Sequence, residues 1–251
     1  MLGALRSIVL AGGCVLALTS CGGGGEPATK LPGGLSGGPT ASAKATAIPD
    51  RTGKEWLKAS SAAFVKVPQV HVKGSIGTGT DKIALDLYIA GKDAKGVIVG
   101  PFGKKPAKIG MIRLNGKLYL RAPEAWTQMG MPASAAKFKD RWFVAPPESV
   151  KAFAPMAAFT TLQGLNQTLL VPAPKDILKV MKPATYKGST VIHLRDGIPD
   201  SRAGMYLASV GDPLPLIMTD PDSKTKITFS YPDPIGIAPP PKPLTLPKTT
   251  A

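Results

Sequence analysis

The feature of the sequence that most constrains the fold is an alternation of apolar and polar residues, which starts at Val70 and recurs as far as Leu120. A period of two is typical of strands with one buried face. Short glycine-containing turns separate the segments, and Asn115-Gly116 is the strongest short signal for a hairpin. The pattern therefore predicts an antiparallel meander of about five strands with one apolar face. The expected strands are 70–76, 83–89, 97–99, 109–114 and 117–120.

Other elements are expected on both sides of this meander. Thr52 and Glu55 have the spacing of a capping box, and apolar residues follow them at helical intervals until Pro68. The expected middle elements are helices at 123–126, 149–162 and 175–181 and a short strand at 141–144. The expected later strands are 190–194, 204–210, 216–219, 226–230 and 235–237. This order is an α+β layout, which a single strongly curved sheet folded over a few helices satisfies.

The N-terminus is typical of an exported protein. One positive charge, at Arg6, precedes an uncharged stretch that is shorter than the ~20 apolar residues a membrane-spanning helix needs. The stretch ends in Leu18-Thr19-Ser20-Cys21, which resembles the lipobox of bacterial lipoproteins. This resemblance implies that a diacylglyceryl group is added to the Cys21 thiol and that the chain is cut before this residue. A plain signal peptide with a chance cysteine is the alternative.

These observations divide the chain into three parts. Residues 1–20 are expected to be a lipoprotein signal peptide, and residues 21–48 a flexible tether that carries the lipid on Cys21. Gly, Ser, Ala, Thr and Pro dominate this tether, so it cannot bury enough apolar surface to fold. Residues 49–251 are expected to be one folded domain with a proline-rich tail. Because two acyl chains anchor a protein stably, we expect the protein on the outer face of the cell membrane.

The net charge of +15 and the pI near 9.9 limit the partners. Nucleic-acid-binding modules interleave basic and aromatic residues. Aromatic residues make up only 6% of this chain, and the expected location also excludes nucleic acid as a partner. Outside the membrane, a basic surface can meet anionic lipid headgroups or anionic wall polymers. The lysines are spread without a run of like charge, which favours the alternative of a solvated basic surface.

No arrangement of residues indicates catalysis, so the chain is not expected to be an enzyme. Matches to catalytic motifs at Ser36 and Ser134 lack the flanking elements or companion motifs that such sites need. His71 and His193 are out of phase with their apolar neighbours and are expected to face solvent. Neither histidine has metal-ligand spacing, and no phosphate-binding glycine loop is present. No metal and no cofactor is expected.

Segments spread over most of the expected mature chain carry a resemblance to a known family. They are 18–21, 70–74, 84–87, 113–120 with Trp126, 205–208, 211–215 and 227–231. In this order they resemble the actinobacterial lipoproteins of the LppX/LprG group, which are similar in fold to the lipoprotein carriers LolA and LolB. The resemblance implies a half-open β-barrel, a curved antiparallel sheet wrapped around a few helices and enclosing an apolar cavity. It departs at Tyr231-Pro232-Asp233-Pro234, whose two prolines bear on the pairing of the last strand.

Members of this group bind lipids or acylated glycolipids and carry or present them across the envelope. The resemblance therefore implies such a ligand and contact with the membrane surface; no protein partner is predicted. The cavity is expected to be lined by inward-facing residues of the strands. They are Val72, Ile76, Leu85, Leu87, Ile98 and Leu207. The alternatives are a sensor or adaptor module whose barrel is filled by its own side chains, and a lipoprotein enzyme.

Overall fold

The computed structural model describes residues 48–101, 106–121, 140–145, 159–171 and 177–245 of the 251-residue chain. The expected signal peptide, Cys21 and nearly all of the tether lie outside the described residues. The helix expected at 123–126, residues 149–158 of the next expected helix, Ser36 and Ser134 also lie outside them. No helix in the described part of the chain is long and apolar enough to cross a membrane.

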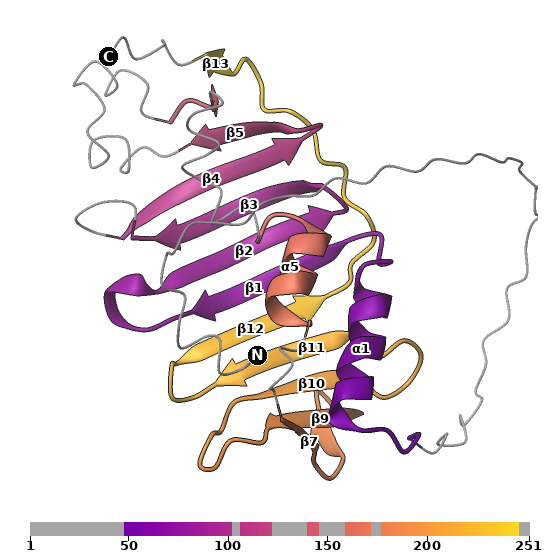
Figure 1. Cartoon of the computed structure of the whole chain (residues 1–251). Helices are drawn as coiled ribbons and strands as arrows, with labels where there is room; N and C mark the ends of the chain where they lie inside the picture. The colour runs from indigo at the N-terminus through magenta and orange to yellow at the C-terminus, as the bar shows by residue number, and fades with distance from the viewer. Residues whose placement is uncertain (1–47, 102–105, 122–139, 146–158, 172–176, 246–251) are drawn as a thin grey trace, which may run out of the picture. The chain divides into compact units, whose positions relative to one another are not determined.

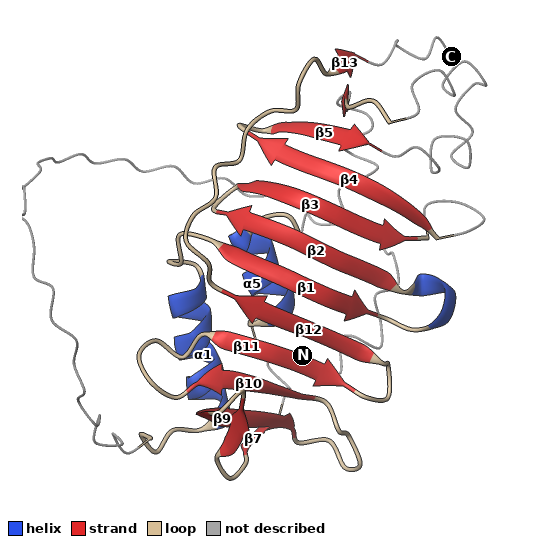
Figure 2. Ribbon diagram, turned by 180° about the vertical axis from the view of Figure 1, so that it is seen from behind, coloured by secondary structure: helices blue, strands red, loops and turns tan. Residues whose placement is uncertain are grey.

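The described residues form one curved, unclosed sheet of thirteen strands with two α-helices on one of its faces (Figures 1 and 2). The first strands in the chain are β1 (Val70–Ile76), β2 (Ile83–Ala90), β3 (Asp93–Gly100), β4 (Ala107–Leu114), β5 (Lys117–Arg121) and β6 (Phe143–Val144). The later strands are β7 (Leu178–Val180), β8 (Ala184–Tyr186), β9 (Ser189–Asp196), β10 (Gly204–Ala208), β11 (Pro215–Asp220), β12 (Thr225–Ser230) and β13 (Leu244–Thr245). This α+β architecture confirms the predicted fold class.

The order of the strands joins the two halves of the chain. The sheet runs β13-β6-β5-β4-β3-β2-β1-β12-β11-β10-β9-β7, and β8 pairs with β9 off this path. Neighbouring strands are antiparallel, except that β13 and β6 are parallel. Strand β1 lies between β2 and β12, so Val72 has Leu87 on one side and Phe229 on the other. The N-terminal meander and the C-terminal strands therefore share one continuous core.

Helix α1 (Gly53–Phe64) begins at the predicted capping box. The Glu55 backbone N–H donates to the Thr52 hydroxyl at 3.3 Å, and the Thr52 N–H donates to the Glu55 carboxylate at 2.8 Å. The helix buries its apolar side against the sheet, and the Phe64 ring meets the Phe229 ring edge-on with centroids 6.0 Å apart. The second helix, α5 (Leu162–Leu169), begins at Thr161, whose hydroxyl accepts from the Gly164 N–H at 2.9 Å.

Two glycines allow neighbouring strands to approach closely on the face that the helices cover. A Cβ on Gly74 would overlap the Lys226 carbonyl oxygen of β12, and a Cβ on Gly96 would overlap the Asp86 carbonyl oxygen of β2. Glycine inside a strand often marks a tight bend or a close approach of another backbone. Gly74 and Gly96 lie in adjoining parts of the sheet, on β1 and β3, and we attribute part of its curvature to them.

Three sequence predictions of elements are wrong. Residues 178–180 of the helix expected at 175–181 form strand β7, because Leu178 and Val180 find pairing partners along β9. Residues 159–161, near the end of the helix expected at 149–162, are not helical, and a separate helix begins at Leu162 and continues to Leu169. Residues 235–237 are not a strand; they follow Pro232 and Pro234, which have no N–H to donate to a ladder. The chain rejoins the sheet only at β13.

Candidate functional site

The face of the sheet that α1 and α5 cover is called the inner face here, and the opposite face the outer face. The six predicted cavity residues all belong to the inner face, and each is at most 3% exposed. Leu85 lies opposite Ile98, and Leu87 lies opposite Val72, so five of the six gather on β1, β2 and β3. Leu207 is on β10, separated from β1 by β12 and β11. These six side chains pack in the core, whereas other residues line the open pocket beside them.

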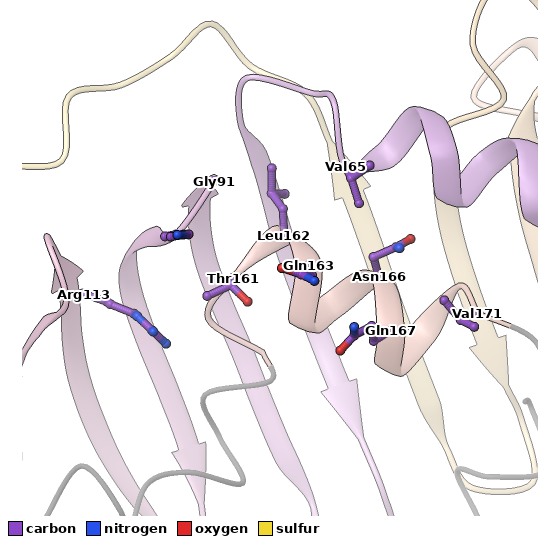
Figure 3. A pocket seen from close by; sticks show the side chains of 10 residues that line it. Val65, Gly91, Arg113, Thr161, Leu162, Gln163, Asn166, Gln167 and Val171 are labelled. Carbon is purple, nitrogen blue, oxygen red and sulfur yellow. The ribbon is translucent and has the colours of Figure 1, made fainter. Parts of the chain in front are cut away.

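This pocket opens where α5 meets the ends of the meander strands (Figure 3). Its volume is about 700 Å³. Residues from the end of α1, the turn between β2 and β3, strand β4, and α5 with its flanking residues form its wall. They are Val65, Gly91, Lys92, Arg113, Thr161, Leu162, Gln163, Asn166, Gln167 and Val171. We refer to this space as the rim pocket.

Hydrogen bonds fix the start of α5 against the meander. The Leu162 N–H donates to the Gly91 carbonyl at 3.0 Å, which joins the first turn of α5 to the turn between β2 and β3. The Arg113 side chain extends from β4 toward the start of α5, and its Nη1 donates to the Thr160 hydroxyl at 3.2 Å (Figure 3). The position of the rim pocket therefore depends on contacts between segments about 50 to 70 residues apart, such as 91 with 162 and 113 with 160.

The charge of the rim pocket is positive. Arg113 and Lys92 line it, and none of the lining residues that the structure describes is an aspartate or a glutamate. The nearest acidic residue in sequence, Asp93, accepts a hydrogen bond from the Asn115 N–H at 3.0 Å. Val65 and Val171 add apolar surface and are 43% and 42% exposed. The pocket therefore combines a cationic lining with apolar residues, which suits an amphiphilic anion.

Asn166 is the most informative polar residue of this pocket. It is 9% exposed, and its Oδ1 is one of two buried side-chain polar atoms without a hydrogen-bond partner among the described residues. The other such atom is the Ser60 Oγ on α1. Buried polar groups are normally hydrogen-bonded to protein or to ordered water, and an unpaired one calls for an explanation such as a water molecule or an ion. Both unpaired atoms belong to the two helices that cover the inner face.

Arg113 and Asn166 were not among the site residues predicted from the sequence. One signal for Arg113 was available, because it has the same phase as the buried residues Ile109 and Met111 in a strand that was predicted. A charged residue at an inward position of an amphipathic strand indicates a polar partner or a ligand. Asn166 had no comparable signal, because the helix that carries it was not predicted.

No protein-family model matches the chain, and no curated protein matches it. Among solved structures, the match to LprF from Mycobacterium bovis covers 75% of this chain and 96% of the LprF chain, with 11% sequence identity and a TM-score of 0.51. The chain has the LprF fold. LppX from Mycobacterium tuberculosis covers 74% of this chain and 97% of its own, with 12% identity and a TM-score of 0.44. An uncharacterized conserved protein from Thermus thermophilus covers 77% and 97%, with 9% identity and a TM-score of 0.36. The predicted resemblance is thus confirmed for the fold.

The outer face of this LprF-like sheet carries a cluster around Asp86. The His71 Nε2 lies 2.7 Å from the Asp86 Oδ1, the Lys73 ammonium lies 2.9 Å from its Oδ2, and the His71 ring stacks on Tyr88 at 4.1 Å. Burial alone would raise the pKa of Asp86, but the hydrogen bonds from His71 and Lys73 outweigh it and hold that pKa below its usual range. The charged and aromatic groups of this cluster contact one another, so we interpret it as a structural feature of the sheet.

His193 lies on the same face, beside Tyr206, whose ring it meets edge-on with centroids 4.7 Å apart. Burial, together with the nearby charge of Arg195, lowers the pKa of His193. Both histidines therefore point away from the inner face, as their phase predicts, but neighbouring rings cover part of each. The described residues contain no group of three or more histidine, cysteine or acidic side chains that could hold a metal ion.

Proposed function

We propose that the protein is a membrane-anchored lipoprotein that binds a lipid or an acylated glycolipid and carries or presents it across the envelope. The observation that supports this proposal most is the rim pocket at the edge of a continuous apolar core. Its lining includes the apolar residues Val65, Leu162 and Val171 as well as the cationic residues Arg113 and Lys92. An acyl chain can contact the first group while a headgroup contacts the second.

Physical chemistry makes this mode of binding feasible without any catalytic residue. Each buried methylene contributes roughly 0.8 kcal/mol. Ten buried methylenes therefore contribute about 8 kcal/mol, from which the loss of translational and rotational freedom must be subtracted. Opening of the packed core around Val72, Leu87 and Ile98 would lengthen the space available to a chain. The proposed role is therefore binding, not chemistry.

The anchor belongs to the same proposal. Cleavage after Ser20 and lipidation of Cys21 would leave the tether 21–48 between the membrane and the folded residues. On this proposal the protein works on the outer face of the cell membrane, and the membrane surface is its first partner.

A sensor or adaptor with a filled barrel is the second candidate. The observation in its favour is the packing of the six predicted cavity residues, which are at most 3% exposed and do not line the rim pocket. If the core stays closed in solution, the inner face has no room for an acyl chain, and the rim pocket would serve another ligand or none.

Native mass spectrometry separates the two candidates. The mature form, residues 21–251 with Cys21→Ser to keep it in solution, is exported in a bacterial host and purified without detergent. A lipid adduct that extracts into organic solvent supports the lipid-binding proposal. A bare protein mass, with no uptake of added phospholipid or glycolipid, overturns it and favours the adaptor.

Two matched variants connect the bound lipid with the rim pocket. Val171→Asp places a charge in the pocket lining, and Val210→Asp places the same charge at a site that is 84% exposed and belongs to another turn. We expect Val171→Asp to reduce lipid uptake and Val210→Asp to leave it unchanged. Equal uptake by both variants would show that the lipid binds elsewhere.

A further inference from the structure

A second hollow lies on the outer face of the sheet, over strands β3, β4 and β5; Figure 2 views the sheet from this face. Val97 pairs with Gly110, and Gly110 pairs with Arg121, so these residues form one row across the three strands. The row faces outward because it is one residue out of phase with the buried Ile98 and Ile109. The volume of this space, which we call the outer groove, is about 490 Å³. Its lining side chains include Lys95, Val97, Lys108, Arg121, Asp140 and Trp142.

The Trp142 indole lies against the floor of the outer groove. A Cβ at Gly110 would come within 3.4 Å of the indole Cη2, so the missing side chain of this glycine leaves room for the ring. The Trp142 carbonyl accepts from the Leu244 N–H at 2.8 Å, which attaches its backbone to β13. The side chain is only partly buried. An indole in an open groove offers a flat, electron-rich surface to the C–H groups of a sugar ring.

Cationic side chains are spaced along the same floor. Lys95 and Val99 are four residues apart on β3, and Lys108 of β4 lies opposite Val99, so the two lysines are separated by about 13 Å along the strands. Both lysines are exposed, and neither forms an ion pair within the part of the chain that the structure describes. Arg121 lies beside the middle of this span and is paired with Asp140 at 3.4 Å.

This arrangement indicates the form of the ligand. Charges spaced along a floor suit a chain with anionic groups at intervals better than a single small anion. The apolar surface of Val97 and Trp142 lies between the two lysines, so the ligand also needs flat, weakly apolar faces between its charges. A bilayer surface supplies the charges, but its plane does not reach a recessed floor. An acidic polysaccharide has both features.

We propose that the outer groove binds an acidic polysaccharide. Sugar rings lie against Trp142 and Val97, while Lys95 and Lys108 bind carboxylate or phosphodiester groups of the same polymer. Asp140 weakens this binding, because it adds a negative charge to the groove. The inference goes beyond lipid binding and is independent of it, since the outer groove and the rim pocket lie on opposite faces of the sheet.

Titration calorimetry with four soluble polymers tests the proposal on the mature form with Cys21→Ser. Polygalacturonate carries carboxylates, yeast phosphomannan carries phosphodiesters, dextran is a neutral glycan, and polyglutamate is a polyanion without sugars. We expect at least one acidic glycan to bind tenfold or more tightly than dextran and polyglutamate, and the better of the two identifies the acidic group. Acidic glycans that bind no better than dextran, or no better than polyglutamate, overturn the proposal.

Charge-matched double variants assign the binding to the groove. Lys95→Gln/Lys108→Gln should lower the affinity for the acidic glycan about tenfold, since two exposed ion pairs are lost. Lys58→Gln/Lys226→Gln is the control, because it removes the same charge at two exposed positions outside the groove. Lys226 is on β12, separated from β3 by β2 and β1. An equal loss in both double variants would mean that only net charge matters, which contradicts the proposal.

The indole and the carboxylate give two further tests. Trp142→Leu should weaken glycan binding several-fold, whereas Trp142→Phe keeps a flat ring and should retain most of it. Asp140→Asn should strengthen binding, a gain that misfolding cannot produce. Asp140 has φ 70°, which asparagine also tolerates, and Asp200→Asn at φ 62° is the matched control. An unchanged or lower affinity in Asp140→Asn would contradict the assignment.

Two last arms separate this site from a membrane surface and from the rim pocket. Vesicles that contain phosphatidylglycerol are offered to the same variants. Vesicle binding as tight as glycan binding, lost with Lys95 and Lys108 but unaffected by Trp142→Leu, would identify a membrane-docking face and overturn the proposal. Val171→Asp alters the rim pocket and should bind the acidic glycan like the wild type. A parallel loss of lipid and glycan in this variant would show one shared site, which also contradicts the proposal.

Discussion

The residues with the clearest mechanical role are glycines on the inner face. Gly96 has φ +157°, and a Cβ there would overlap the Asp86 carbonyl oxygen of the neighbouring strand. Backbone atoms cannot yield as a flexible side chain does, so the strands would have to separate. We predict that Gly96→Ala lowers the free energy of unfolding by about 2–3 kcal/mol, as overpacking of a core does. Urea denaturation measures this change.

Gly236→Ala is the matched control for this prediction. A Cβ at Gly236 would meet no atom within 4 Å, and its φ is not in the left-handed region. We expect a change within about 0.5 kcal/mol, as for most surface substitutions. Equal stability of the two variants would contradict the role assigned to close approach at Gly96.

Asp86 should give the outer face a defined dependence on pH. Its pKa is below the ordinary value of 3.8 in the folded protein, despite its partial burial, because His71 and Lys73 donate hydrogen bonds to it. Its contribution to stability is therefore complete above about pH 4 and is lost as the pH falls through the folded-state pKa. We predict that the wild type is more stable than Asp86→Asn at pH 7 and that this difference shrinks toward pH 3.

Urea denaturation at the two pH values measures the effect, and Asp200→Asn serves as its control. Asp200 is exposed and has a positive φ that asparagine also tolerates. The free energy of unfolding of Asp200→Asn should differ from that of the wild type by the same small amount at both pH values. A constant difference for Asp86→Asn would show that the cluster with His71, Lys73 and Tyr88 does not depend on the charge of the carboxylate.

At the scale of elements, the capping box of α1 can be tested separately from the sheet. The Thr52 hydroxyl accepts from the Glu55 N–H, and this bond satisfies a donor that the helix itself cannot. We predict that Thr52→Ala lowers the free energy of unfolding by about 1 kcal/mol. Thr78→Ala is the control, because Thr78 precedes the short 3₁₀ turn (Gly79–Asp81) without making a side-chain cap. Thermal unfolding of both variants measures their stability. A loss of stability in Thr52→Ala alone would be due to the cap, whereas an equal loss in both would be due to the removal of a threonine.

Local signals predicted some elements well, and the reason is visible in the structure. Asn115 and Gly116 have φ values of 52° and 76°, the positive values that a tight hairpin turn requires, so the Asn-Gly pair determines the β4–β5 hairpin. Strand β7 could not be predicted in the same way, since residues 178–180 are stabilised by pairing with β9 rather than by their own pattern. A short apolar segment is compatible with a helix or a strand, and here the pairing with the distant strand β9 determines that it is a strand.

The candidate site was harder to predict than the fold. The alternation in β1 to β3 correctly placed Val72, Leu87 and Ile98 on the buried face, because phase alone determines the face. Phase does not tell whether a buried face encloses an open cavity or a packed core. The rim pocket exists because hydrogen bonds from Leu162 to Gly91 and from Arg113 to Thr160 hold the start of α5 against the meander. Such contacts between remote segments leave no periodic signal in the sequence.

At the scale of the whole molecule, the pairing of β1 with β12 makes one sheet from two segments that are about 155 residues apart, as in the contact of Lys73 with Thr228. The loop between them must close before either half completes its core, which makes folding slow. The net charge of +15 adds an attraction to anionic membrane surfaces beyond any covalent anchor.

These two contributions to membrane association can be separated experimentally. Cys21→Ser removes the only thiol that the proposed lipidation uses, and the basic surface remains. We predict that the wild type stays with the membrane fraction in 1 M salt, where the Debye length is about 3 Å, because two acyl chains hold it. Cys21→Ser should associate weakly at low salt and be released as salt rises. Release of both forms by salt would contradict lipidation at Cys21, while retention of both would show an anchor that the proposal does not include.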